Sequence, residues 1–531
     1  MSRLLELVCW RLLIQREPHR WGKGMGMPKL LLGIDIGTSS VKGIICDSEG
    51  HLVAQAAREH VLHSPQPGWA EESPAGWWES TCEVVRECLS HPAVQSDQIA
   101  GVGVTGMVPA VVLLDQDGQP LRPSIQQNDA RAIAEIEELR GRVAPQRFFE
   151  TTGASLSQQS VGPKLLWIQR HEPAIWECTR TILGSYDYVN YCLTGYRAVE
   201  VNWALESGLY NLHTQTWSDD LLAAAHVTSD RLPPIRRPTE IIGGVSRAAS
   251  ALTGLRAGTP VVAGTADHVG AALAAGIRED GDLLIKFGSA GDVLYSTQTL
   301  VVDPRLYIDY HDIPGQYLLN GCMATSGSLL KWLVQQFFQD DATAAADHHQ
   351  TLYQFLDAQA EKLPAGSDGL VVLPYFLGEK TPILDPLARG VVVGLTLYHT
   401  RYHLYRAVLE GVVFGFRHHV EVLRERGQFP RRVVASEGGA ASRLWRQIAA
   451  DVLNLPVLYL ANNPGASLAA AFVAGIGVGV FDTWDAIDRF LSIEDTTHPD
   501  ATRSAVYDQL FGLYCQLYPQ LKGLFPLLRG A

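Results

Sequence analysis

The chain has 531 residues, which is more than one hydrophobic core usually takes and predicts two or more domains. Hydrophobic residues make up 47% and charged residues 19%, a globular composition that excludes a largely disordered chain. The formal net charge is −13 and no dense lysine or arginine stripe offsets it, so we do not expect a nucleic-acid partner. An anionic small molecule is still compatible, because backbone N–H groups in a tight turn can bind phosphate on an acidic protein.

The cysteines and the uncharged stretches bear on the environment of the chain. The 8 cysteines are scattered without a C-x-x-C pair, which favours a reducing, cytoplasmic environment over a disulfide framework or a zinc site. Residues 1–28 lack a signal-peptide pattern and precede the first clear strand, so we expect an N-terminal extension outside the core. The stretch 465–481 is short and glycine-rich, and it predicts a buried helix rather than a membrane span. We therefore expect no membrane partner.

Short apolar runs separated by turn residues open the first half of the chain. Residues 30–36, 41–46 and 52–58 predict strands joined by tight turns, which together form a meander. Residues 99–105 and 111–114 predict further strands, and helical periodicity follows them. This order of elements predicts an α/β fold.

A second strand–turn–strand unit appears about half a chain later. Residues 283–287 and 293–296 are its predicted strands, and a buried-looking strand at 260–264 precedes it. Repetition of one unit at this spacing favours two related lobes over a string of small domains. We place the first lobe at 29–277 and the second at 283–525.

The turn after the first strand carries the first candidate site. Asp35 ends the strand, Gly37, Thr38 and Ser39 form the turn, and Lys42 follows. Glycine and small hydroxyl residues let backbone N–H groups approach phosphate oxygens, and a carboxylate at a strand end can hold Mg²⁺ through water. An ordinary hairpin with an exposed aspartate explains the same pattern equally well, so this motif alone decides nothing.

Asp267 follows a predicted buried strand and precedes a helix. A carboxylate at this place can cap the helix by accepting N–H bonds from its first turn. It can also be a general base that points into a cleft. Helix capping is the commoner explanation of such a residue when it stands alone, although both roles can hold at once.

Two glycine-containing junctions follow in the second half. Gly288 and Ser289 form a turn that could bind phosphate, with a plain hairpin as the alternative. Gly439 and Ala440 lie between a predicted strand at 432–435 and a predicted helix. Small residues there leave room for a flat base or allow close helix–strand packing, and packing is the simpler interpretation.

The order of these features resembles that of the FGGY carbohydrate kinases. The motifs that carry the resemblance most strongly lie at 378–382, 385–390 and 406–411, and it extends over residues 29–484. The resemblance implies a two-lobed α/β fold of the actin/hexokinase, ribonuclease H-like type with the active site in the interlobe cleft. It also implies ATP-dependent phosphorylation of a small sugar, with Mg²⁺ as the second cofactor.

The resemblance also implies a role for each candidate residue. Asp35 is similar to the family's Mg·ATP-associated aspartate, and Asp267 is similar to its catalytic base. The other nucleotide-binding positions that it implies are Gly37, Thr38, Ser39, Lys42, Gly288, Ser289, Gly439 and Ala440. The sugar-binding positions, by similarity to the xylulose kinase branch, are Met107, Val108, Asn128, Asp129 and Arg131.

The chain departs from the xylulose kinase branch at several positions. Val108 stands where histidine is usual, and Gln126 and Gln127 stand where tryptophan commonly precedes the sugar-binding segment. Glu437 replaces the first residue of a triple glycine, and no acidic residue lies around Pro464. The first two departures concern the sugar and the last two concern the nucleotide.

The expected reaction is conversion of D-xylulose to D-xylulose 5-phosphate. A kinase for another ketose or a polyol, of the ribulose or erythritol type, is one alternative. A non-catalytic, actin-like nucleotide-binding protein is an alternative from a different class. The expected partners are the sugar and ATP, and a homodimer is a further expectation.

Overall fold

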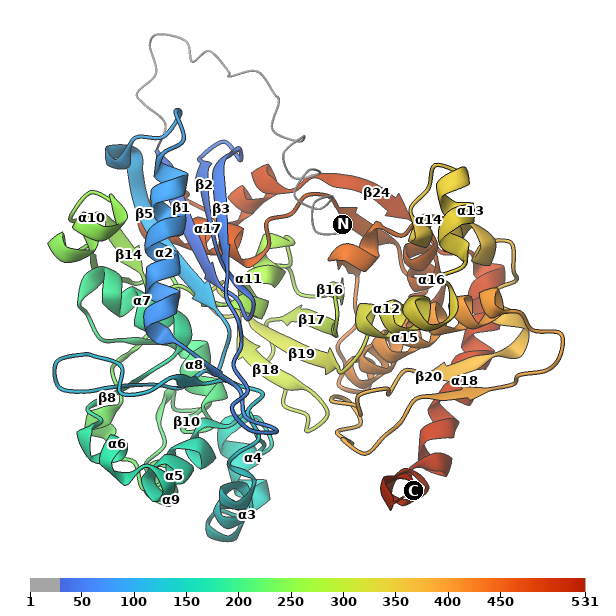
Figure 1. Cartoon of the computed structure of the whole chain (residues 1–531), viewed down its shortest axis with the longest axis horizontal. Helices are drawn as coiled ribbons and strands as arrows, with labels where there is room; N and C mark the ends of the chain where they lie inside the picture. Colours follow the sequence, from blue (N-terminus) through green and yellow to red (C-terminus); the bar gives the residue numbers. More distant parts are fainter. Residues whose placement is uncertain (1–28, 531) are drawn as a thin grey trace.

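The structure is a computed structural model that describes residues 29–530, so the predicted extension 1–28 lies outside the described residues. Two seven-stranded sheets form the centres of two halves, which Figure 1 shows side by side with helices packed around each. The two-lobed α/β fold expected from the sequence is confirmed. Among the described residues, no helix is both long and apolar enough to cross a membrane.

The first sheet is built around the predicted meander. Its strand order is β13-β14-β5-β1-β2-β3, with β15 paired to β5. The strands are β1 (Leu30–Ile36), β2 (Ser40–Asp47), β3 (Leu52–Glu59), β5 (Ile99–Gly106), β13 (Ile241–Gly244), β14 (Pro260–Val262) and β15 (Thr265–Ala266). Strands β1, β2 and β3 are antiparallel neighbours and β5 runs parallel to β1.

The second sheet repeats this arrangement. Its order is β18-β19-β17-β16-β22-β23-β24. The strands are β16 (Asp282–Phe287), β17 (Gly291–Thr297), β18 (Tyr307–Tyr310), β19 (Tyr317–Met323), β22 (Arg432–Ser436), β23 (Val457–Leu460) and β24 (Ile493–Thr497). Strand β16 pairs antiparallel with β17 and parallel with β22, as β1 does with β2 and β5.

Helices and short two-stranded sheets complete both halves. The helices of the first half are α2 (Pro74–Leu89), α3 (Ile133–Arg142), α4 (Pro145–Thr152), α5 (Val161–His171), α6 (Pro173–Cys178), α7 (Ser185–Thr194), α8 (Val201–Glu206), α9 (Asp219–Ala224), α10 (Arg247–Thr253) and α11 (Asp267–Ala274). Those that follow are α12 (Gly327–Phe337), α13 (Asp341–Asp347), α14 (Leu352–Ala360), α15 (Arg401–Glu425), α16 (Arg443–Leu453), α17 (Ala466–Gly477) and α18 (Ala501–Leu521). The short paired strands are β4 (Glu71–Glu72), β6 (Val112–Leu114), β7 (Ser124–Ile125), β8 (Thr181–Leu183), β9 (Val199–Glu200), β10 (Tyr210–Asn211), β11 (Thr216–Trp217), β12 (Ile235–Arg236), β20 (Val371–Leu373) and β21 (Val391–Val393).

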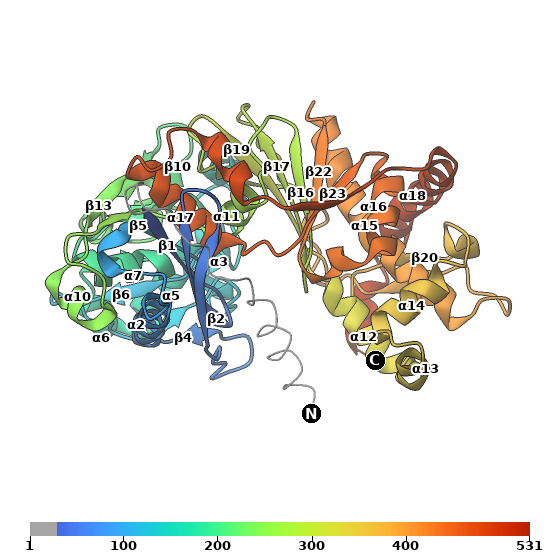
Figure 2. The same ribbon diagram turned by 90° about the horizontal axis from the view of Figure 1, so that it is seen from above.

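Helix α17 crosses from the second predicted lobe to the first sheet, as Figure 2 shows beside β1 and α11. It is the buried helix expected within 465–481. A Cβ atom on Gly33 would lie 1.9 Å from the carbonyl oxygen of Ser467, and one on Gly103 would lie 2.0 Å from that of Ala470. Glycine at both positions therefore lets the helix backbone rest directly on β1 and β5. The boundaries at 277 and 283 stay predictions, because α17 returns to the first sheet between β23 and β24, which belong to the second sheet.

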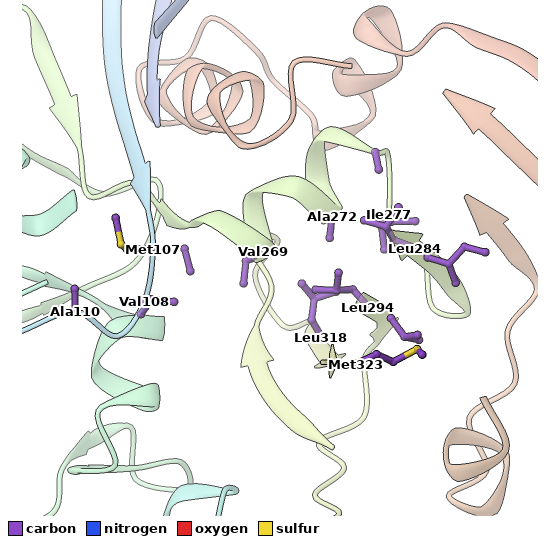
Figure 3. Close-up of a cluster of buried hydrophobic side chains, with 14 of the residues drawn as sticks. Met107, Val108, Ala110, Val269, Ala272, Ile277, Leu284, Leu294, Leu318 and Met323 are labelled. Atoms are coloured by element: carbon purple, nitrogen blue, oxygen red, sulfur yellow. The ribbon is translucent and has the colours of Figure 1, made fainter. Parts of the chain in front are cut away.

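An apolar core joins the two halves. Figure 3 shows Val269 and Ala272 of α11 between Met107 and Val108 on one side and Leu284, Leu294 and Leu318 on the other. Strand β18 is also fastened to the first half, because Asn202 of α8 exchanges hydrogen bonds of 2.8 and 2.9 Å with the backbone of Tyr310. The strands that carry the site are thus held against one another by burial and by backbone hydrogen bonds.

Candidate active site

A cleft of about 1740 Å³ lies between the two halves, and residues of both sheets line it. Its charged lining residues include Asp35, Lys42, Glu206, Asp267, His268, Lys286, Asp292, Asp309, Lys380 and Glu437. A large cleft with convergent charged groups is the usual form of a small-molecule site. The prediction of an interlobe active site agrees with this geometry.

Two carboxylates of the first half face each other in the cleft. Burial raises the pKa of Asp35 to about 7 and the nearby charge of Asp267 adds to the rise, while Lys42 and Lys286 oppose it. The buried Oδ1 atom of Asp35 has no hydrogen-bond partner among residues 29–530. A buried carboxylate oxygen without a partner, next to a second carboxylate, is suited to a divalent cation.

Asp267 begins helix α11 with one oxygen held and the other open. Ala266 is the N-cap, so Asp267 is the first helical residue and not the cap considered from the sequence. The backbone N–H of His268 donates to Oδ1 of Asp267 over 2.7 Å. The side chain of Asp267 is 37% exposed, and it lines the cleft. Its Oδ2 has no hydrogen-bond partner among residues 29–530 and can therefore meet a hydroxyl group of a substrate.

His268 connects Asp267 to the second sheet. Its Nδ1 lies 3.4 Å from Oδ1 of Asp267, and its Nε2 lies 3.1 Å from Oδ2 of Asp309 on β18 and 3.8 Å from Oε1 of Glu206 on α8. Burial alone would lower the pKa of His268, but Asp309 and Asp267 hold it well above its usual value. Burial and Asp309 raise the pKa of Glu206 to about 8. The imidazole of His268 thus lies between carboxyl groups from three elements, α8, α11 and β18.

The second half contributes a lysine to the opposite wall. Nζ of Lys286 on β16 lies 3.2 Å from Oδ2 of Asp292 and 3.8 Å from Oε1 of Glu437. Burial alone would lower the pKa of Lys286, but Asp292, Glu437 and Asp267 raise it above its usual value. Burial would likewise raise the pKa of Asp292, and Lys286 holds it below its usual value. The cleft therefore has an acidic wall on β1 and, on β16, a lysine whose neighbours favour its cationic form.

The two predicted phosphate turns lie at the ends of β1 and β16. Thr38 and Ser39 are exposed, and the N–H of Gly37 donates to the carbonyl of Ser40 over 3.1 Å. In the second turn, the carbonyls of Gly288 and Ser289 accept N–H bonds of 2.7 to 3.1 Å from the start of α12. These turn residues flank the cleft-lining Asp35 and Lys286 rather than lining the cleft themselves.

The glycine-rich junction after β22 divides into two parts. A Cβ atom on Gly439 would lie 2.7 Å from the ring of Trp445 and 2.8 Å from Phe287, and Ala440 is fully buried. Both residues therefore serve helix–strand packing, which was the simpler interpretation of the sequence. Gly438 lines the cleft and has open space where its side chain would be. The open part of this junction is thus Gly438, and a contact of Gly439 and Ala440 with the base stays a prediction.

The predicted sugar residues separate into a lining group and a buried group. Val108 lines the cleft, whereas Met107 is 1% exposed and accepts a 2.7 Å hydrogen bond on its carbonyl from Ser185. Asn128 is exposed, and Gln127 beside it lines the cleft. Of the five predicted sugar residues, Val108 is thus the one that lines the cleft in the structure.

Asp129 and Arg131 form a buried ionic network instead of opening into the cleft. Nη2 of Arg131 lies 2.7 Å from Asp129 and 2.7 Å from Glu71, and its side chain is fully buried. The guanidinium also lies 3.8 Å from the ring of Trp69, and the N–H of Ala70 donates to Asp129 over 2.6 Å. In this arrangement the two residues support the segment that carries Gln127, and their contact with a sugar stays a prediction.

Comparison with known proteins assigns the chain to a family. Residues 30–274 match the N-terminal domain of the FGGY family of carbohydrate kinases, and residues 284–478 match its C-terminal domain. A xylulose kinase of Bacillus subtilis (strain 168) is 30% identical over 94% of this chain and 99% of its own length. The chain belongs to the FGGY family of carbohydrate kinases. It is a sugar kinase with ATP as phosphoryl donor, and the resemblance inferred from the sequence is confirmed.

Further relatives of this FGGY kinase include other xylulose kinases and a kinase named for different sugars. The structure of xylulose kinase from Rhodospirillum rubrum is 47% identical, with a TM-score of 0.88 over 93% of this chain and 99% of that one. The L-xylulose/3-keto-L-gulonate kinase of Escherichia coli (strain K12) is 29% identical over 94% of this chain and 98% of its own length. Membership of this family disfavours the non-catalytic, actin-like alternative.

Several residues that line the cleft of this FGGY kinase were not predicted from the sequence. Lys286 had a usable signal, because it is a charged residue in an apolar strand two positions before Gly288. Glu206, His268 and Asp309 had none, since they come from α8, α11 and β18 and meet only in the folded protein. Long-range contacts of this kind depend on the packing of β18 against α8, which the sequence pattern does not reveal.

Proposed function

We propose that this FGGY kinase converts D-xylulose and ATP to D-xylulose 5-phosphate and ADP, with Asp267 as general base. The observation that carries the proposal is the geometry of Asp267, whose Oδ1 is held by the N–H of His268 while Oδ2 is open to the cleft. Xylulose kinases among the relatives, at 30% and 47% identity, support the choice of sugar.

In this reaction the sugar hydroxyl loses its proton and gains the phosphoryl group. Oδ2 of Asp267 accepts the proton of the terminal sugar hydroxyl, and the sugar oxygen bonds to the γ-phosphorus as the bond to the ADP oxygen breaks. Phosphoryl transfer needs little covalent chemistry from the protein, so positioning and electrostatics carry most of the effect. A closed cleft would also exclude water as a competing acceptor.

Asp35 is the residue that would hold Mg²⁺ beside the phosphates. Its buried, unpartnered Oδ1 and its raised pKa of about 7 describe a carboxylate that lacks a cationic partner. When bound, Mg²⁺ offsets phosphate charge during transfer. The turns with Gly37, Thr38 and Ser39 on one side and Gly288 and Ser289 on the other would face the phosphates.

The base of the nucleotide would lie along the open part of the second glycine-rich junction. Gly438 leaves space there, and Tyr459, Leu460 and Asn462 continue the same wall of the cleft. An apolar and amide-containing wall beside an open glycine is suited to a flat, weakly polar ring. In this proposal the nucleotide lies against the second half and the sugar against the first.

The sugar end of the cleft favours an uncharged substrate. Asp267 and Asp309 line it, so a sugar carboxylate would meet like charges there. This disfavours an acidic sugar such as the keto-gulonate named for one relative. Another ketose or a polyol, of the ribulose or erythritol type, is the remaining alternative, because Val108 offers no hydrogen bond to a hydroxyl.

A coupled ADP-release assay tests the proposal. The panel contains D-xylulose, D-ribulose, L-ribulose, erythritol and D-gluconate, each with the wild-type enzyme and with Asp267→Asn. We expect the highest kcat/KM for D-xylulose and loss of that turnover in the variant. A kcat/KM at least about tenfold higher for another substrate, a gap of ~1.4 kcal/mol, would replace D-xylulose as the substrate. A cytoplasmic location and a homodimer stay predictions.

A further inference from the structure

Lys286 is a cation enclosed by carboxylates from both halves of the molecule. Asp292 and Glu437 lie within 3.8 Å of its Nζ, and the charges of Asp35 and Asp267 reach it through the cleft. Its side chain is 17% exposed and lines the cleft. A lysine placed between the nucleotide wall and the catalytic carboxylate can bind an anion that bears several charges.

The two acidic partners of Lys286 are not equivalent. Asp292 is its cross-strand neighbour, lies 3.2 Å away and is 23% exposed. Glu437 lies 3.8 Å away and is 49% exposed. Its side chain makes no hydrogen bond within residues 29–530. An exposed ion pair at this distance contributes little to stability, so Glu437 can leave Lys286 readily while Asp292 stays.

The backbone of Glu437 indicates that its position has a use. The residue has φ 72° and ψ 177°, a conformation that is essentially restricted to glycine. Gly438 follows it with open space where a side chain would be, so the turn has room to move on this side. A glutamate held in such a conformation costs free energy, and such strain gathers at ligand clamps and switch regions. This strained backbone holds the carboxylate of Glu437 beside Lys286, the lysine of β16.

We propose that Lys286 binds a phosphate group of the nucleotide and that Glu437 is a latch, which neutralises Lys286 in the empty enzyme and is displaced when nucleotide enters. A di- or triphosphate carries more charge than one carboxylate, so it wins the competition for the ammonium group. Adenosine has no such group and leaves the latch in place. The proposal rests on the kinase activity but not on the identity of the sugar or of the base.

Calorimetric titration with ADP and with adenosine, without sugar, tests the latch. Glu437→Gln keeps the shape of the side chain and removes its charge, so we expect ADP to bind about three- to tenfold more tightly and adenosine to bind unchanged. Glu437→Gly should show the same tightening and a higher thermal midpoint, because glycine adopts a positive φ without strain. Glu361→Gln, at an exposed glutamate after α14, is the matched control and should change neither affinity.

A double-mutant cycle connects the latch to Lys286. We expect Lys286→Met to weaken ADP binding at least about tenfold and to abolish the tightening caused by Glu437→Gln. Circular dichroism checks that Lys286→Met folds. If the unpaired Asp292 prevents folding, the double variant Lys286→Met/Asp292→Asn removes both charges and takes its place.

Three results would overturn the proposal. Weaker binding of adenosine to Glu437→Gln would show that Glu437 contacts the nucleoside directly. Tightening of ADP by Glu437→Gln that persists in the Lys286→Met background would show that Glu437 does not act through Lys286. Unchanged ADP affinity in Lys286→Met would leave Lys286 as a structural partner of Asp292. None of these readouts uses turnover, so they remain separate from a failure of the proposed sugar or base.

Discussion

The hairpins β1–β2 and β16–β17 have the same arrangement of strands, but the acidic residue and the lysine are exchanged between their two strands. Asp35 on β1 is the cross-strand partner of Lys42 on β2, and Lys286 on β16 is the cross-strand partner of Asp292 on β17. Both strand residues lie two positions before the first glycine of their turn. The repeated hairpin therefore places the carboxyl group of Asp35 on one wall of the cleft and the ammonium group of Lys286 on the other.

The two hairpins also differ in how well their charges are satisfied. Lys286 has carboxylates within 3.2 and 3.8 Å, whereas the buried Oδ1 of Asp35 has no hydrogen-bond partner among the described residues. Lys42 opposes the raised pKa of Asp35 without forming an ion pair that would cancel it. The acidic wall is thus prepared for a cation and the basic wall for an anion.

The largest expected effect follows from removing the base of the first half. Asp267→Asn should lower kcat by roughly 10²–10⁴-fold, the usual contribution of a positioned general base. ADP affinity should stay near the wild-type value, because the nucleotide wall belongs to the second half. Steady-state kinetics and calorimetry measure the two quantities. A variant that keeps wild-type turnover would mean that Asp267 has only a structural role.

Asp35→Asn should lower the catalytic rate and at the same time raise the stability of the metal-free enzyme above neutral pH. We expect kcat to fall by roughly 10²-fold or more, because the site for the metal ion loses its charge. Its folded pKa of about 7 lies above the unfolded value near 3.8, so Asp35 makes the wild type less stable as pH rises through this window. The metal-free variant should therefore be more stable than wild type at pH 8, by up to about 4 kcal/mol at about 1.4 kcal/mol for each pKa unit, and the difference should disappear as the pH falls toward 4.

Urea unfolding with EDTA at both pH values measures this difference. A wild-type enzyme that is at least as stable as the variant at pH 8 would show that Asp35 is already satisfied without a metal. The basic wall provides the contrast, because Lys286→Met leaves Asp292 unpaired and should lower stability instead.

Asp309→Asn tests the connection from the second sheet to the base. Asp309 lies 3.1 Å from Nε2 of His268, which in turn lies beside Asp267. Without this charge the imidazole loses its anchor, and we expect kcat to fall about tenfold, ~1.4 kcal/mol, with the KM for ATP unchanged. An equal rise in both KM values with unchanged kcat would place Asp309 in substrate binding instead.

Val108→His should give the smallest effect and concerns the sugar. A histidine could donate to a sugar hydroxyl where valine cannot, so the KM for D-xylulose should fall up to about tenfold, equivalent to 0.5–1.5 kcal/mol. If the pocket is built around valine for another ketose or polyol, the same change should raise the KM for that substrate. Comparing D-xylulose with erythritol in both proteins decides between these outcomes.

The local elements of both hairpins could be predicted from the sequence. The expected strands 30–36 and 283–287 correspond to β1 (Leu30–Ile36) and β16 (Asp282–Phe287), because apolar runs that end in glycine turns have few other uses. The position of Asp267 at the end of the first half followed from the same reasoning. Local pattern therefore located the walls of the cleft.

Contacts between distant segments could not be predicted in this way. Helix α17 packs on the first sheet although it follows most of the second, and the only local signals are small residues at the contact. Asp129 and Arg131 satisfy each other and Glu71 in a buried network, which the sequence cannot distinguish from a sugar site. Charged residues that are paired and those that are free look alike until their neighbours are known.

Nucleotide affinity measured with and without Mg²⁺ distinguishes the two walls in one experiment. If Asp35 holds the metal and Lys286 holds phosphate, Lys286→Met weakens ADP binding at least about tenfold in EDTA and in Mg²⁺ alike. Asp35→Asn should then weaken ADP binding only in Mg²⁺ and strengthen it slightly in EDTA, because a carboxylate that repels phosphate is gone. Equal dependence of both variants on Mg²⁺, or weaker binding of ADP to Asp35→Asn in EDTA, would contradict this division between the acidic and the basic wall.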